Sequence, residues 1–220
     1  MPIRHHCPPP NPYVEWLKSL GCVFYAPLTA AETRDLISGQ DISVLQSVQW
    51  NNTENAWYFQ FNNTSQIGSI AEWNGLNMPL TINNLAYGYM CEIKITNWYR
   101  QQDGVCPMVL YGRASASNTQ YTVPYLNVWY KIAYMWPPTV QGVTKYDKWY
   151  RDGAETYRVN RGSTTATVPQ SATTGVWVNN VPNSQSGWRP YTYGKFYMRN
   201  AMLFNRELSL QEIRMIQGYA

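Results

Sequence analysis

Apolar and polar residues alternate with a period of two over much of the chain, which is typical of β-strands that bury one face. The clearest example is residues 87–96, with the sequence YGYMCEIKIT. One side of this segment carries Tyr89, Cys91, Ile93 and Ile95, and the other side carries Glu92 and Lys94. We therefore expect a half-buried strand whose apolar side faces a core.

The same kind of pattern predicts further strands along the chain. They are expected at residues 22–28, 56–61, 105–113, 128–136, 145–151, 155–160, 175–179 and 196–204. Turn-forming pairs such as Asp103-Gly104 and Asp152-Gly153 lie between them. Many short strands without helical periods between them are typical of an antiparallel sandwich or barrel, and not of a parallel α/β sheet.

Two short helices are expected at the ends of this β-rich region. Residues 13–20 can form one, which Gly21 would end. At the other end, Ser209 and Glu212 form a capping box, because each side chain can satisfy the other residue's backbone amide. Apolar residues at helical spacing follow, and Gly218 closes the segment. We expect this helix to cover a sheet edge or the core.

The N-terminal residues 1–12 form a proline-rich arm. We therefore divide the chain into residues 1–21, an arm with a short helix, and residues 22–220, one β-sandwich. Glu15 and Lys18 interrupt what would be the apolar core of a signal peptide, so we expect synthesis in a host cytoplasm without a signal.

Composition disfavours several classes of protein. Charged residues make up only 14% of the chain, against roughly 25% in an average domain, and aromatic residues make up 15%. The net charge of +4 comes without a basic cluster, which disfavours nucleic acid as a partner. No apolar run reaches the 18 or so residues of a membrane span. The four cysteines include no C-x-x-C pair and are too sparse for a disulfide scaffold.

Catalysis is also disfavoured, and we expect that the protein is not an enzyme. The two histidines, His5 and His6, lie in the arm, so a folded site lacks the usual general base. The nearest acidic grouping is Asp147, Asp152 and Glu155, which straddles a hairpin turn. A retaining glycosidase needs two carboxyl groups about 5 Å apart, and we interpret this grouping as a solvated turn with a structural aspartate.

Four stretches, in order, resemble the concanavalin A-like, laminin G-like jelly roll. They are residues 23–28 with the following 35–39 turn, residues 129–134, residues 148–153 and residues 202–213. The last, MLFNRELSLQEI, is the most specific, because it is similar to the strand and capped helix that end the family's domain. The resemblance implies an all-β fold, an antiparallel jelly-roll β-sandwich with one short C-terminal helix.

Calcium is the metal that this resemblance raises, because many relatives bind it. Asp35 matches one position of the family's metal loop. Where an acidic pair often precedes the family's ending, this chain has Arg199 and Asn200. A cation thus stands where a calcium ligand would be needed, so calcium is disfavoured and we expect no cofactor.

Zinc is disfavoured as well. His5, His6, Cys7 and Cys22 lack the spacing of a zinc site. We interpret residues 1–12 as a simple arm and expect Cys22 to be buried.

Aromatic residues at strand ends and in loops are the candidate ligand-binding residues. Core packing explains most of the ten Trp. The candidates are Trp73, Trp98, Tyr99, Trp136, Trp188 and Tyr191. Loop aromatics flanked by Asn, Gln and Arg suit a glycan or a protein surface equally well, and both alternatives stay open.

The jelly roll serves lectins, adhesion modules, glucanases and virion proteins, so the fold leaves the function open. Our first hypothesis is a non-catalytic structural or adhesion protein on a virion surface, such as a capsid decoration or fibre component. Its partners would be further protein subunits, in a homo-oligomer or a capsid lattice. The alternative is a lectin-like module that binds cell-surface glycans through loop aromatics. A third hypothesis, a glycoside hydrolase, conflicts with the missing catalytic residues.

Overall fold

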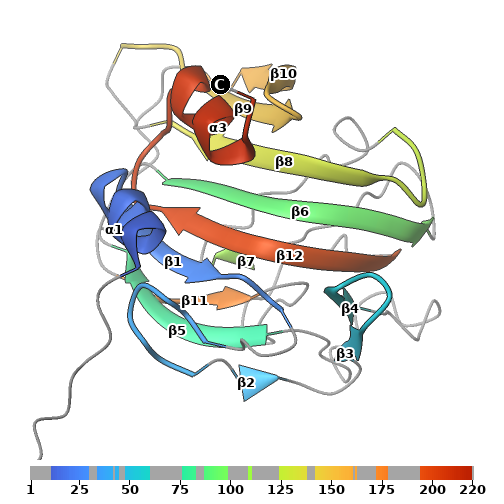
Figure 1. Ribbon diagram of the computed structural model, residues 1–220. Coiled ribbons are helices and arrows are strands. Elements are labelled where there is room, and N and C mark those ends of the chain that lie inside the picture. The colour runs from blue at the N-terminus through green and yellow to red at the C-terminus, as the bar shows by residue number, and fades with distance from the viewer. Residues whose placement is uncertain are drawn as a thin grey trace, which may run out of the picture.

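In the part of the chain that the structure describes, two antiparallel sheets form a β-sandwich with two helices outside them (Figure 1). The computed structural model describes residues 11–29, 34–41, 43–44, 48–59, 76–82, 87–98, 109–110, 124–137, 142–160, 162, 172–177 and 194–219. The predicted fold class is confirmed. No helix in these ranges is long and apolar enough to span a membrane.

The described residues contribute eight strands to the main sheet. Its spatial order is β10 (Ala154–Asn160), β9 (Tyr146–Arg151), β8 (Trp129–Trp136), β6 (Tyr87–Trp98), β12 (Gly194–Phe204), β4 (Ala56–Phe59) and β3 (Val48–Asn51). The eighth, β1 (Cys22–Ala26), pairs with the last part of β12, while β4 pairs with an earlier part. Strand β12 therefore lies at the centre of the sheet.

Four strands within the described ranges form the second sheet. Its order is β2 (Ser43–Val44), β5 (Leu76–Ile82), β11 (Ala172–Trp177) and β7 (Val109–Leu110). Strand β5 was not among the predicted strands, and neither were β2 and β3. Pro79 lies within β5 and is paired with Gly175 of β11. Proline normally disfavours a central strand, so the sequence around Pro79 did not predict β5.

The inner face of the main sheet carries the larger hydrophobic core. The four apolar residues of the 87–96 alternation, Tyr89, Cys91, Ile93 and Ile95, are all buried in it, as predicted. Trp149 of β9 is 1% exposed and packs in the same core, with its ring centroid 4.8 Å from that of Tyr134. The strand alternation therefore identified correctly which side of β6 faces inward.

The two helices cover part of the outer face of the same sheet. Helix α1 (Pro12–Ser19) begins after the N-cap Asn11, and helix α3 (Leu210–Gln217) begins after Ser209 with both capping-box hydrogen bonds in place. Val14 and Leu17 of α1 and Ile213 of α3 are buried in a second hydrophobic cluster with outward-facing strand residues. Both predicted helices are confirmed, and both faces of the main sheet contribute to packing.

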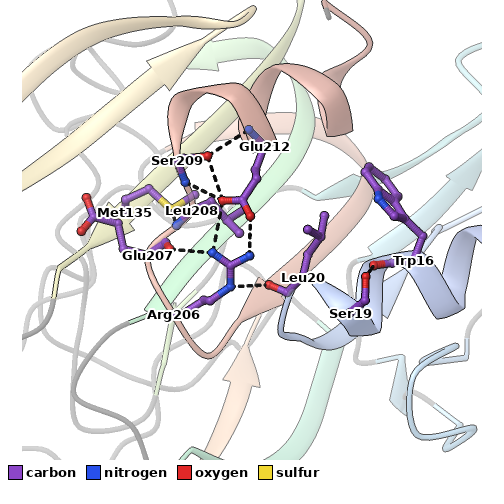
Figure 2. Close-up of polar contacts among 9 residues, drawn as sticks. All are labelled: Trp16, Ser19, Leu20, Met135, Arg206, Glu207, Leu208, Ser209 and Glu212. Carbon is purple, nitrogen blue, oxygen red and sulfur yellow. Dashed lines mark hydrogen bonds and ion pairs between the residues drawn. The ribbon is translucent and has the colours of Figure 1, made fainter.

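Arg206 joins the two helices (Figure 2). Its Nε donates to the carbonyl oxygen of Leu20 at the end of α1, over 2.8 Å. Its two terminal nitrogens donate to the carboxylate of Glu212 in the first turn of α3, over 3.1 and 2.6 Å. Gly21 lies beside this joint at φ +82°, and a Cβ there would approach Asn205 Oδ1 to 2.7 Å. The C-terminal end of α1 and the N-terminal end of α3 are thus held together.

Candidate binding site

Of the six predicted aromatic site residues, the structure describes the side chain of one. Trp136 ends β8, is half-buried against the inner core, and has Lys145 Nζ 4.8 Å from a ring centroid. The backbone of Trp98 ends β6. The side chain of Trp98, and all of Trp73, Tyr99, Trp188 and Tyr191, lie outside the described residues.

The acidic residues of the β9–β10 hairpin each have a structural partner. Asp147 is fully buried and accepts a hydrogen bond from the Tyr134 hydroxyl over 3.1 Å. Asp152 Oδ1 accepts from the backbone amide of Lys131 over 3.0 Å. Glu155 forms an ion pair with Arg158 on its own strand. These carboxylates stabilise the hairpin and its neighbours.

Asp35, the residue that matches a metal-loop position, organises its own loop. Its carboxylate accepts from the backbone amide of Tyr25 over 2.8 Å and from those of Ile37 and Ser38 over 3.0 Å each, and the Ser38 hydroxyl adds a further bond. The side chain is fully buried. Among the residues that the structure describes, no three His, Cys, Asp or Glu side chains gather where they could hold a metal ion. Cys22 is buried, as the sequence predicted.

A pocket of about 260 Å³ lies on the outer face of the main sheet, between α1 and α3. Its floor includes Glu92 of β6, Asn200 of β12 and Tyr25 of β1. Tyr13 in the first turn of α1 and Gln217 in the last turn of α3 form parts of its wall. The two helices meet at the Arg206 joint, and the pocket lies near their opposite ends.

A chain of hydrogen bonds crosses the floor of this pocket. The Tyr25 hydroxyl lies 3.4 Å from Asn200 Oδ1, and Asn200 Nδ2 donates to Glu92 Oε1 over 3.0 Å. The second carboxylate oxygen of Glu92 accepts from Arg199 Nε over 2.7 Å. Two consecutive residues of β12 can both reach Glu92 because the register shifts here and Asn200 adopts φ +53°. Such a bulge redirects side chains, and asparagine tolerates the left-handed region better than most residues.

Lys131 and Gln217 fix the other side of the pocket. Lys131 Nζ donates to the backbone carbonyl of Gln217 over 2.6 Å, where the end of a helix carries partial negative charge. Gln217 Oε1 accepts from the backbone amide of Gly153 over 2.7 Å, and Arg214 Nε donates to the Gly153 carbonyl over 2.9 Å. The last turn of α3 is therefore anchored to both β8 and the β9–β10 turn.

Two tyrosines form the aromatic part of the pocket. The rings of Tyr13 and Tyr25 pack edge to face, with centroids 5.7 Å apart. Burial, with a smaller effect from the Tyr13, Cys22 and Glu92 charges, raises the pKa of Tyr25 to about 12. Burial also raises the pKa of Tyr13. Both hydroxyls therefore keep their protons at neutral pH and remain hydrogen-bond donors.

Sequence reasoning did not select these pocket residues. Glu92 was recognised only as part of the polar side of its strand, and Asn200 only as a departure from a calcium motif. Tyr13, Lys131 and Asn200 are far apart in sequence, so only the sheet register and the helix positions bring them together. The signal in the sequence that could have pointed to the pocket was Glu92, a charged residue on the side of its strand that faces away from the core.

Comparison with known proteins gives similar folds but no relatives in sequence. The sequence matches no protein-family model and no curated protein sequence. One similar solved structure is the ligand-binding domain of botulinum neurotoxin serotype D in complex with N-acetylneuraminic acid (TM-score 0.55, 13% identity, 92% of this chain and 52% of that one). A second comes from a study of botulinum neurotoxin type C, whose cell entry depends on two ganglioside molecules (TM-score 0.55, 11% identity, 92% and 52%).

A third similar structure is the binding domain of Paraclostridial Mosquitocidal Protein 1 (TM-score 0.55, 10% identity, 90% of this chain and 52% of that one). The chain spans about half the length of each of these structures. At such low identity, the likeness establishes a shared β-rich fold and leaves the ligand to be argued from this chain's own residues.

Proposed function

We propose that this protein is a non-catalytic adhesion or binding domain whose ligand is a glycan. The observation that carries this proposal is the pocket between α1 and α3, where carboxylate, amide, ammonium and phenol groups lie beside the apolar side chains of Met90, Met202 and Ile216. Ligand sites commonly combine apolar walls with a few convergent polar groups. We also propose that residues 22–220 belong to the concanavalin A-like, laminin G-like group of sandwiches, with residues 1–21 as an added arm and helix.

The pocket suits binding and not hydrolysis. Its lining includes one carboxylate, Glu92, and both oxygens of that carboxylate already accept hydrogen bonds from Arg199 and Asn200. Glycoside hydrolysis commonly needs two carboxyl groups on opposite sides of the scissile bond. The acids of the β9–β10 hairpin have structural partners, as described above, and do not supply the second group.

The glycan class is supported from two directions. Two of the structures that share the fold are described with ganglioside or N-acetylneuraminic acid as ligands. Independently, this chain combines amide and phenol side chains with little charge, which suits hydroxyl-rich ligands. The six aromatic residues predicted from the sequence, Trp73, Trp98, Tyr99, Trp136, Trp188 and Tyr191, remain proposed contacts of a glycan or a protein partner.

A broad glycan array tests this function. Fluorescently labelled full-length protein should bind a defined subset of glycans, and heat-denatured protein should bind none. If the folded protein binds no glycan on the array, nor in solution at millimolar concentrations, the glycan proposal is refuted.

A second proposed function is a component of a virion surface, made in a host cytoplasm and assembled as a homo-oligomer or on a capsid lattice. The proline-rich arm supports it, because residue 11 leads directly into α1 and such a segment can bind a neighbouring subunit. Mass photometry of full-length protein and of a variant lacking residues 1–10 tests this idea. A monomer in both cases, together with no binding to any capsid, would contradict it.

A further inference from the structure

We propose that the pocket between α1 and α3 takes a single uncharged sugar unit of its glycan. This inference rests on the proposed function and adds the location of the site and the chemical class of the ligand.

The size of the pocket limits the ligand to about one ring. Pockets for drug-sized ligands range from roughly 300 to 1,000 Å³, and this one measures about 260 Å³. The sheet closes it from below, and Tyr13 and Gln217 border it from two different helices. A unit of a longer glycan can enter, while the rest of the chain would extend into solvent.

The charges of the pocket are compensated, which favours an uncharged ligand. The Glu92 carboxylate forms an ion pair with Arg199, with 2.7 Å between oxygen and nitrogen. The Lys131 ammonium donates to the carbonyl oxygen of Gln217 at the end of α3. A charged ligand would meet a group of its own sign as well as one of opposite sign. Hydroxyl groups, in contrast, can donate to Glu92 and accept from Lys131, and they meet no repulsion from a charge of their own sign.

The remaining lining suits the two kinds of surface that a sugar ring presents. Met90, Met202 and Ile216 provide apolar contacts for its C–H groups. Tyr13 is 38% exposed, and it adds an aromatic ring with a hydroxyl donor at the rim. Asn200 Oδ1 adds an acceptor on the floor, where the Tyr25 hydroxyl makes a long contact of 3.4 Å with it.

The walls of the pocket are already fixed before a ligand arrives. Arg206 holds α1 against α3 at one end, and the hydrogen bonds of Gln217 hold α3 at the other. A preformed site loses little conformational entropy on binding. This arrangement allows a small ligand with few contacts to bind measurably.

Two matched pairs of variants test the site. Y13A removes the aromatic wall, and Y125A removes another exposed tyrosine that does not line the pocket. N200G removes the amide at a residue with φ +53°, and N127G does the same at φ +61° outside the pocket. Glycine suits both backbones, and the second member of each pair lies outside the pocket. Thermal melting verifies that each variant is folded.

The full-length protein and its variants are titrated with the methyl glycosides of glucose, galactose and N-acetylglucosamine, and with N-acetylneuraminic acid. We expect at least one neutral glycoside to bind, and Y13A and N200G to weaken it by about 10-fold or more, while Y125A and N127G stay within about twofold. If a glycan binds the wild type and all four variants equally, the site lies elsewhere and the proposed function stands. If only N-acetylneuraminic acid binds, the uncharged class is wrong. If none of these four sugars binds while the glycan array is positive, this inference fails and the proposed function stands. If the array is negative as well, both fail.

Methionine methyl NMR gives a readout that does not depend on substitution. Met90 and Met202 line the pocket, whereas Met198 is buried in the inner core. Addition of the neutral glycoside should shift the methyl signals of Met90 and Met202 and leave that of Met198 unchanged. Equal shifts at all three, or a shift at Met198 alone, would overturn the assignment.

Discussion

Replacing Arg206 with methionine removes the joint between α1 and α3 while keeping much of the side-chain volume. The guanidinium donates to the Leu20 carbonyl, to the Glu207 carbonyl and twice to the Glu212 carboxylate. Hydrogen bonds to charged groups contribute about 1.5–3 kcal/mol each when measured singly, but they are not additive. The Arg206 and Glu212 side chains are 37% and 24% exposed, so solvent weakens the pair. We expect R206M to lower the free energy of unfolding by about 2–3 kcal/mol at pH 7.

The pH dependence of this loss separates the ion pair from the carbonyl bonds. The Arg206 ion pair, aided by the Ser209 amide and hydroxyl, lowers the pKa of Glu212 from 4.5 to about 2. Because the folded pKa lies below the unfolded one, the stabilisation is present above about pH 4.5 and is lost as the pH falls towards 2. The full shift corresponds to about 3.4 kcal/mol, and with the partial exposure we expect about 1–2 kcal/mol.

Urea unfolding of wild type and R206M between pH 7 and the lowest pH at which both stay folded measures this effect. The difference between the two free energies of unfolding should shrink as the pH falls below 4.5, because the other carboxylates titrate alike in both proteins. R206K serves as the control that keeps the charge but loses the planar fork, and it should show an intermediate loss. A difference between wild type and R206M that stays constant from pH 7 to pH 3 would refute the role assigned to the Glu212 pair.

Three other predictions concern stability. D35A should lower the free energy of unfolding in urea by about 3 kcal/mol, because it leaves the buried Tyr25 amide and the part-buried amides of Ile37 and Ser38 without their acceptor; a loss below about 1 kcal/mol would contradict the anchoring role. G21A should lower the melting temperature more than G39A, since both glycines have positive φ but only a Cβ at Gly21 would meet Asn205 Oδ1, at 2.7 Å; equal losses would show that the contact relaxes freely. The raised pKa of Tyr25, about 12 in the folded state against 10.0, means that its stabilisation is present below pH 10 and is lost as the pH rises towards 12. Y25F should therefore lose less stability than wild type over that alkaline range, and parallel curves would exclude this contribution.

Local signals in the sequence were sufficient for much of the fold. The alternation over 87–96 identified both the strand β6 and its buried side, and the capping box placed the start of α3 at the observed residue. In both cases the determining interactions lie within a few residues of one another. Strand β5 was not predicted because Pro79 weakens its local strand pattern. Its pairing with β2 and β11 also depends on segments that are distant in the sequence.

The candidate site was less accessible to sequence reasoning. Tyr13, Glu92 and Asn200 come from three separate elements, and each is unremarkable within its own segment. The bulge that lets both Arg199 and Asn200 reach Glu92 is a property of the pairing between β6 and β12. Aromatic residues were chosen as candidates because the chain is rich in them. The one whose side chain the structure describes, Trp136, packs against the inner core.

The central position of β12 has a consequence for synthesis on the ribosome. Strands β1, β4 and β6 all pair with β12, although β12 is the last strand to be made. Each of these strands therefore keeps an open hydrogen-bonding edge until residue 204 has left the exit tunnel. Unpaired edges promote aggregation, and pairings between distant segments form slowly. The main sheet consequently closes only after translation of nearly the whole domain, and its unpaired strand edges are open to pairing with other chains until then.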